Sequence, residues 1–165
     1  MNNYNHLDLD KVKDLVCQYT SIKQASDYIQ NEEIIFNPLV IKSKLKDSEE
    51  ALNLLKKDFN LSFDGIVDIG DILVKASKDI CLDGYELANV LTFSNHCLRI
   101  KNRMSSLSDD LNIKGYSESL FIDENLIKRI DKVVDINGNI KEDASPKLKS
   151  IFEAINRNSD RIRSC

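Results

Sequence analysis

Glycine and proline are scarce in this sequence, with 5 and 2 among 165 residues, and tryptophan is absent. A many-stranded sandwich needs such residues at its turns, so their scarcity favours long helices over a β-rich fold. No apolar run approaches the roughly 20 residues that a membrane-spanning helix requires. The first ten residues are polar and acidic and do not form a secretory signal. We therefore expect a cytoplasmic protein with no membrane partner.

The motifs of common enzyme classes are also missing. The chain has no glycine-rich loop of phosphate-binding spacing, no GxSxG elbow and no HExxH pair. Its four cysteines include no CxxC pair, so neither a disulfide framework nor a zinc site is expected. Paired acids at Glu32-Glu33, Glu49-Glu50, Asp109-Asp110 and Glu142-Asp143 are interpreted as solvated charges. We predict no catalytic residue, no cofactor and no metal in this chain.

Charge is unevenly distributed along the sequence. The whole chain carries a net charge of −4, with −7 in residues 1–125 and +3 in residues 126–165. If the chain binds a polyanion, the binding surface is therefore expected near the C-terminus. The alternative is an ordinary solvated face on an amphipathic helix. The residues considered as possible phosphate contacts are Lys147, Lys149, Arg157, Arg161 and Arg163.

Apolar residues recur at helical spacing through most of the chain. One stripe contains Ile41, Leu45, Leu52 and Leu55, and a broader one contains Val90, Phe93, Cys97, Ile100 and Met104. The sequence thus predicts a mainly α fold, an irregular helical bundle. The expected helices cover about residues 10–19, 22–29, 38–55, 71–76, 84–104, 125–134 and 146–165.

The connections suggest how these helices are organised. Residues 57–68 are irregular, and residues 105–116 are expected to be a polar loop or a short strand edge. We predict a division there, into a helical core region at 1–115 and a second region at 116–165, together forming one compact unit. Asp71 is expected to cap the short helix at 71–76.

The second region contains one strong turn signal. Asn137-Gly138 lies between β-prone arms, which predicts a small β-hairpin near 134–142 with a type I′ turn. Ser145-Pro146 then begins the last helix, because serine caps free backbone N–H groups and proline at the first helical position has none to lose. No stop signal follows before Cys165, so we expect a lever-like helix that continues into further sequence.

The segment at 131–152, DKVVDINGNIKEDASPKLKSIF, resembles the hallmark stretch of MutS-II proteins, the second bacterial MutS family. The family pattern is an Ile-Asp pair, a turn centred on glycine, an acidic residue and Ala-Ser-Pro-x-Leu before a long helix. We assign a structural role in this motif to Asn137, Gly138, Asp143, Ala144, Ser145, Pro146 and Leu148. Upstream segments at 7–16, 50–55 and 63–69 follow in the family's order. One departure is that Asp79-Ile80 replaces a glycine expected near position 80.

This resemblance implies a division of labour. MutS-II proteins begin with a helical core and lever, followed by a dimeric ATPase and usually an Smr endonuclease domain. The chain would then be a non-catalytic scaffold in a bacterial parent that uses ATP and magnesium. The parent is expected to be a homodimer that acts on DNA or ribosomes, in recombination suppression, DNA repair or ribosome rescue. The scaffold's partners would be the downstream domains of its own chain.

Two other hypotheses for the function of the chain remain open. The chain could be a stand-alone helical adaptor that binds a protein through an exposed apolar groove. It could also be a small enzyme of unknown type, although no cluster of residues favours that hypothesis.

Overall fold

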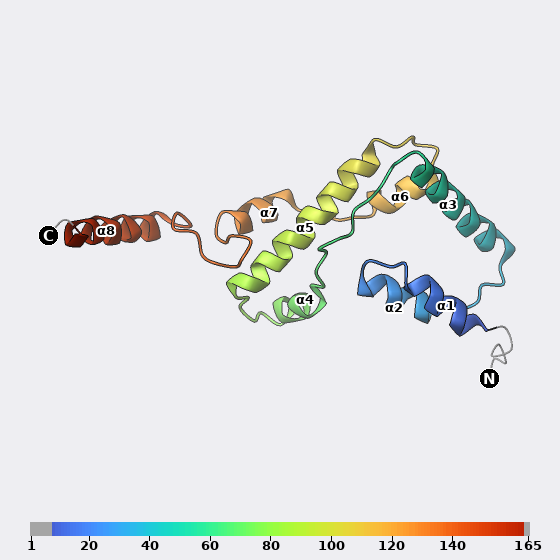
Figure 1. The fold of residues 1–165 in the computed structure, drawn as a ribbon, viewed down its shortest axis with the longest axis horizontal. Coiled ribbons are helices and arrows are strands. Elements are labelled where there is room, and N and C mark those ends of the chain that lie inside the picture. The colour runs from blue at the N-terminus through green and yellow to red at the C-terminus, as the bar shows by residue number, and fades with distance from the viewer. Residues whose placement is uncertain (1–7, 164–165) are drawn as a thin grey trace. The chain divides into compact units, whose positions relative to one another are not determined.

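The computed structural model describes residues 8–163, except the side chains of Arg161 and Arg163 (Figure 1). Over this range the chain is helical, as the apolar spacing predicts, and it contains no sheet. The helices are α1 (Leu9–Cys17), α2 (Lys23–Asn31), α3 (Pro38–Lys56), α4 (Gly70–Ser77), α5 (Gly84–Ser105), α6 (Asn112–Glu118), α7 (Glu124–Asp131) and α8 (Pro146–Arg163).

The helices belong to two compact units that are discontinuous in sequence. Unit 1 consists of Met1–Ile66 and Arg99–Leu120, and unit 2 consists of Val67–Leu98 and Phe121–Cys165. Helix α5 contributes its N-terminal part to unit 2 and its C-terminal end to unit 1. The division at residues 115 and 116 stays a prediction.

In unit 1, α1 packs against α2, and α3 packs against α6. Polar contacts also join the first pair, α1 and α2. The Lys13 Nζ donates to the carbonyl oxygens of Gln30 at 2.8 Å and Glu32 at 2.7 Å. The Gln30 amide donates in turn to the Asp14 carboxylate at 2.8 Å. These bonds satisfy two C-terminal carbonyl groups of α2 that have no partner within the helix.

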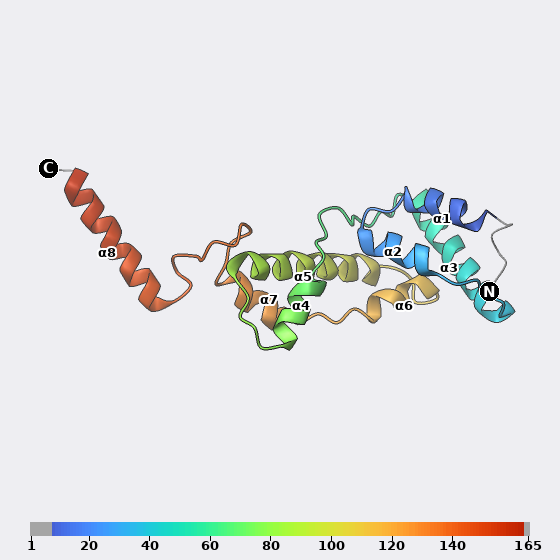
Figure 2. The same ribbon diagram turned by 90° about the horizontal axis from the view of Figure 1, so that it is seen from below.

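The core of unit 2 lies between α5 and α7. Leu91, Ile130 and Val134 are buried against one another, and Leu87 and Val90 pack around them. Both α4 and α7 lie against the N-terminal half of α5 (Figure 2). These two neighbours explain the N-terminal half of the broad apolar stripe predicted for residues 84–104, because one helix that packs on several others needs a wide apolar face.

The predicted β-hairpin at 134–142 is wrong. Only one isolated antiparallel bridge forms there, between Val134 and Ile140. The Gly138 N–H donates to the Asp135 carbonyl oxygen at 3.1 Å, and the Asp135 N–H donates to that of Asn139 at 2.9 Å. Gly138 alone takes positive φ in this turn, at +81°, so the type I′ geometry is also wrong. A three-residue loop with glycine in the left-handed region replaces it.

The expectation of a loop or strand edge at 105–116 is wrong in part, because α6 begins at Asn112. Its first turn is stabilised by the Glu50 side chain, which comes from α3. The expected cap at Asp71 is also wrong. The Asp68 carboxylate accepts from the Gly70 N–H at 2.8 Å at the start of α4. The group that caps α6, Glu50, is far from α6 in sequence, so the local sequence pattern does not predict this cap.

Two helices end at an aspartate that occupies the left-handed region. Asp58 follows α3 with φ +58°, and Asp79 follows α4 with φ +55°. In both cases the next N–H donates back over the last turn, from Phe59 to Leu54 and from Ile80 to Lys75. This is the bonding of a Schellman motif, whose usual left-handed residue is glycine. Asp79 therefore stands where backbone geometry favours the glycine that the family pattern has near position 80.

No helix within residues 8–163 is long and apolar enough to cross a bilayer. Cys17, Cys81 and Cys97 are free thiols. Burial raises the pKa of the Cys97 thiol above its usual value.

We predict that Asp79→Gly raises the free energy of unfolding by about 0.5–1 kcal/mol, because it removes the left-handed strain of a residue with a Cβ. Urea denaturation followed by circular dichroism measures the change. The control is Asp27→Gly inside α2, where the same substitution is expected to lower stability by a few tenths of a kcal/mol. A loss of stability in Asp79→Gly would contradict the assignment of this cap.

Candidate functional site

The family-motif residues form a turn that is held by one carboxylate. We call residues 135–139 the motif turn. The Asp135 Oδ1 accepts from the N–H groups of Asn137 at 2.8 Å and Asn139 at 2.9 Å, and its Oδ2 accepts from the Asn139 side-chain amide at 3.1 Å. The Asn139 side chain and backbone, followed by the Asn137 N–H, hold the pKa of Asp135 below its usual value of 3.8.

The motif turn lies directly against the beginning of α5. A Cβ on Gly84 would meet the Gly138 carbonyl oxygen at 2.1 Å, and a Cβ on Gly138 would meet the Tyr85 backbone at 2.6 Å. Real Cβ atoms do not approach so closely, so both positions require glycine. Backbone therefore packs on backbone at this junction, which joins the segment after α7 to the N-terminus of α5.

The start of α5 is itself fixed by a reciprocal cap. The Asp83 carboxylate accepts from the Glu86 N–H at 2.8 Å, and the Glu86 carboxylate accepts from the Asp83 N–H at 3.0 Å. This is a capping box. Glu86 also pairs with Lys75 of α4. The Lys75 ammonium, followed by the Asp83 N–H, lowers the pKa of Glu86.

The remaining motif residues lead into α8. The Ala144 N–H donates to the Lys141 carbonyl oxygen at 3.0 Å. Ser145 caps the helix, because its hydroxyl accepts from the Leu148 N–H at 3.2 Å, and Pro146 occupies the first helical position. Asp143 is exposed beside these residues. The motif therefore places a turn and a helix start, and its residues hold backbone in position.

The side chains considered for phosphate binding lie on α8, and Lys147, Lys149 and Arg157 are exposed. Those of Arg161 and Arg163 lie outside the described side chains. Lys149 shares a shallow hollow with Glu142, Asp143 and Glu153. These acids reduce the positive potential around Lys149. Phosphate binding by α8 stays a prediction.

The interpretation of all the paired acids as solvated charges is wrong for Glu50, whose carboxylate is buried. Glu50 is 8% exposed, and its Oε2 accepts from the Ile113 N–H of α6 at 3.0 Å. Its Oε1 lies 3.6 Å from the Lys46 Nζ. A carboxylate at a helix N-terminus satisfies an unpaired N–H and interacts favourably with the helix dipole. The adjacent Glu49 is exposed, so the paired acids give no sequence signal that distinguishes the two.

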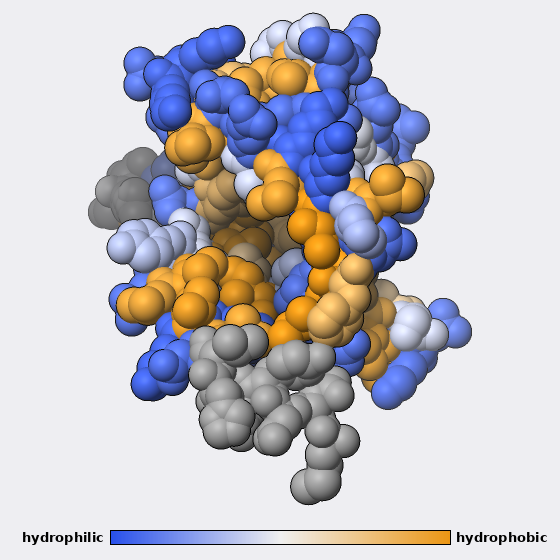
Figure 3. All heavy atoms as spheres, turned by 90° about the vertical axis from the view of Figure 1, so that its right-hand side faces the viewer, coloured by the Kyte–Doolittle hydropathy of each residue, from blue (hydrophilic) through white to orange (hydrophobic). Residues whose placement is uncertain are grey.

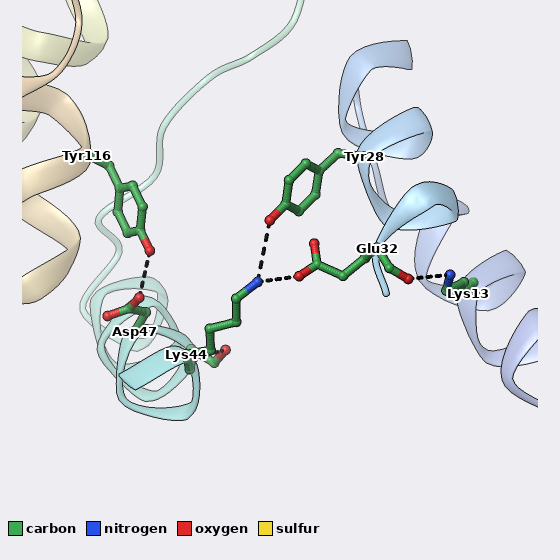
Figure 4. Close-up of polar contacts among 7 residues, drawn as sticks. Lys13, Tyr28, Glu32, Lys44, Asp47 and Tyr116 are labelled. Carbon is green, nitrogen blue, oxygen red and sulfur yellow. Dashed lines mark hydrogen bonds and ion pairs between the residues drawn. The ribbon is translucent and has the colours of Figure 1, made fainter. Parts of the chain in front are cut away.

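Around α3, unit 1 contains a second set of polar contacts (Figure 4). Lys44 forms an ion pair with Glu32 and donates to the Tyr28 hydroxyl at 3.4 Å. The Tyr116 hydroxyl donates to Asp47 at 2.7 Å. The hydrogen bond from Lys44 lowers the pKa of Glu32, and the bond to Asp47 raises the pKa of Tyr116. Every one of these groups is used in joining α2 or α6 to α3.

The described residues also expose much apolar side chain. The stripe of α3 is open at Ile41, Leu45, Leu52 and Leu55, and α1 exposes Val12, Leu15 and Val16. The space-filling view shows broad apolar areas on the face of the molecule where α1 to α3 lie (Figure 3). The expected apolar face of α8 is open too, with Ile155 54% exposed. Exposed apolar patches are typical of an interface.

We predict that Gly84→Ala lowers the free energy of unfolding by about 1–3 kcal/mol, because the new methyl group displaces the motif turn. Urea denaturation measures the loss. The matched control is Gly115→Ala in α6, where no atom beyond the adjacent residues and the backbone of the same helix lies within 4 Å of the added Cβ. That variant is expected to gain about 0.5–1 kcal/mol through helix propensity. Equal effects of the two substitutions would contradict the close contact.

A pH dependence follows from Asp135. Its carboxylate has a lower pKa in the folded chain than in the unfolded chain, so its contribution to stability is full above the unfolded value and is lost as pH falls through the folded value. We predict that Asp135→Asn flattens the fall in unfolding free energy between about pH 5 and pH 2. The control, Asp143→Asn, removes an exposed acid of the same segment. Equally steep curves for wild type and Asp135→Asn would be evidence against this role.

Comparison with known proteins gives several relatives that carry the same name. Proteins named Endonuclease MutS2 are similar to the chain in Clostridium perfringens strain SM101, at 24% identity over 160 residues, and in Thermotoga neapolitana, at 28% over 145 residues. A third, from Halothermothrix orenii, is 26% identical over 165 residues. These matches cover 95%, 88% and 94% of this chain, which spans 20%, 19% and 21% of the relatives.

No family model matches the chain, and no solved structure matches it. The similarity to MutS2 proteins extends over nearly all of the chain, whereas the chain spans about a fifth of the length of these curated relatives. As its sequence predicts, the chain resembles the MutS-II family, and it is consistent with an N-terminal region of such a protein.

Proposed function

We propose that this chain is the N-terminal core and lever scaffold of a MutS-II protein and that it is not itself catalytic. The observation that carries the proposal is similarity to MutS2 proteins over 95% of this chain but only a fifth of theirs. A scaffold for larger domains must present surfaces that those domains cover. The exposed apolar stripe of α3 is a surface of this kind.

In this proposal the parent protein supplies the chemistry. ATP and magnesium bind in an ATPase region, and an endonuclease domain cleaves nucleic acid. The parent is a cytoplasmic bacterial homodimer that acts on DNA or ribosomes, with roles in recombination suppression, DNA repair or ribosome rescue. The chain's direct partners are then the other domains of its own parent.

Helix α8 is the mechanical element of the scaffold. A helix rises about 1.5 Å per residue, so 18 residues extend over about 27 Å as one stiff rod. Its N-terminal end is capped by Ser145 and follows the motif turn, which is held against α5. Movement of a neighbouring domain would therefore reach the core between α5 and α7 through the segment at residues 135–146.

A stand-alone adaptor is the second candidate. It is favoured by an apolar groove of about 450 Å³ in unit 2, which is the kind of surface that binds a partner helix. The gene distinguishes the two candidates. A reading frame that continues into a phosphate-binding GxxxxGK[ST] motif supports the scaffold, whereas a stop codon after Cys165 supports the adaptor.

For the chain alone we predict weak binding to nucleic acid, because its net charge is −4 and acids surround Lys149. Fluorescence titration with branched DNA and with ribosomes at 50 and 200 mM salt should give a Kd of about 1 µM or weaker. The control replaces Lys147, Lys149 and Arg157 with alanine and should change the salt dependence only slightly. Nanomolar binding that is lost in this control would contradict the proposal and identify α8 as a primary contact surface.

A further inference from the structure

Unit 2 contains a groove whose walls come from three helices. Leu73 and Ala76 of α4, Leu87 and Val90 of α5, and Leu126 and Ile130 of α7 line it. Its volume is about 450 Å³, and Arg129 is the one charged residue in its lining. Leu73 is 56% exposed and Leu126 is 43% exposed, so the groove is open to solvent. An open apolar groove between helices is suited to the apolar face of another helix.

Helix α8 presents a face of the matching kind. Leu148, Ile151, Phe152 and Ile155 follow one another at i, i+3, i+4 and i+7, so they form one stripe. Ile151 is 45% exposed, and Ile155 is more exposed still. The opposite face carries Ser150, Glu153 and Arg157. Leu148 and Phe152 are half-buried, and Phe152 lines a hollow with Glu142 and Asp143. At Ile151 and Ile155 this apolar face is open to solvent.

The connection between groove and helix is short. The Lys141 N–H donates to the Val133 carbonyl oxygen at 2.8 Å, and Val133 lines the groove. The Lys141 ammonium is bonded to the Asp131 carboxylate at 3.2 Å, which fixes the same point. Since α8 begins at Pro146, only residues 142–145 separate it from this point. Four extended residues reach about 14 Å.

The short length of this link distinguishes between the possible occupants of the groove. A short link that spans two sites gives an effective concentration in the millimolar range, well above that of any second copy in dilute solution. A foreign helix would have to displace this tethered competitor. The chain's own α8 is therefore favoured over a second copy or another protein.

We propose that α8 is a strap that docks its Leu148–Ile155 stripe into the groove between α4, α5 and α7, with residues 142–145 as the hinge. The inference uses the groove, the stripe and the tether alone, and does not rest on the function proposed above. Docking would bury Leu73 together with Ile155. It would make the groove available to other helices only when α8 is withdrawn.

The experiment is hydrogen exchange on the full 165-residue chain. Ile155→Asp places a charge on the stripe, and the matched control Ser150→Asp places the same charge on the opposite face of α8. Both positions are exposed in the described structure, so neither charge perturbs the helix itself, and circular dichroism verifies this. We expect Ile155→Asp to accelerate exchange in α4 and α7 about fivefold or more, and Ser150→Asp to leave it unchanged.

A reciprocal variant tests the groove side. Leu73→Asp should accelerate exchange in α8, which a local defect in α4 would not do. Equal exchange in Ile155→Asp and Ser150→Asp, or an unchanged α8 in Leu73→Asp, would overturn the proposal. Exchange is also measured at two concentrations tenfold apart. Protection that rises with concentration would show that a second copy fills the groove, which also overturns it.

Discussion

The helices of this chain carry more apolar side chain than they bury against one another, and this imbalance governs the rest of the structure. Buried apolar residues gather mainly where α4, α5 and α7 meet, around Leu91 and Val134. Elsewhere, helix pairs are joined to a large extent by polar contacts, such as Glu50 to α6 and Lys13 to the end of α2. Apolar burial is the main favourable term in folding, so such a chain gains stability from each surface that covers it.

The motif turn shows how a family signature becomes a structural requirement. Gly138 and Gly84 are far apart in sequence, yet each is needed because of the other's backbone. Asp135 orders the turn, and the Asp83–Glu86 capping box orders the helix that receives it. The signature resides in residues that determine backbone position. A motif of this kind can be recognised in sequence although its role is structural and not catalytic.

The sequence predicted helices well, because apolar spacing and local caps such as Ser145 depend on neighbouring residues. It failed where a distant group decided the outcome. Glu50 stabilises the start of α6, which made a helix from a segment expected to be a loop or strand edge. Asn-Gly predicted a hairpin, but contact with Gly84 and the bonds to Asp135 favoured a single turn. The groove in unit 2 could not be predicted, since it depends on how three helices meet.

The central claim is that the exposed apolar stripe of α3 is an interface to other parts of a larger MutS-II protein. Hydrogen exchange of the α3 amides, compared between the 165-residue chain and the full-length parent, tests this most directly. The account predicts exchange about tenfold slower or more in the parent, around Leu45 and Leu52, because neighbouring domains cover that face. Identical exchange rates in the two proteins would contradict it.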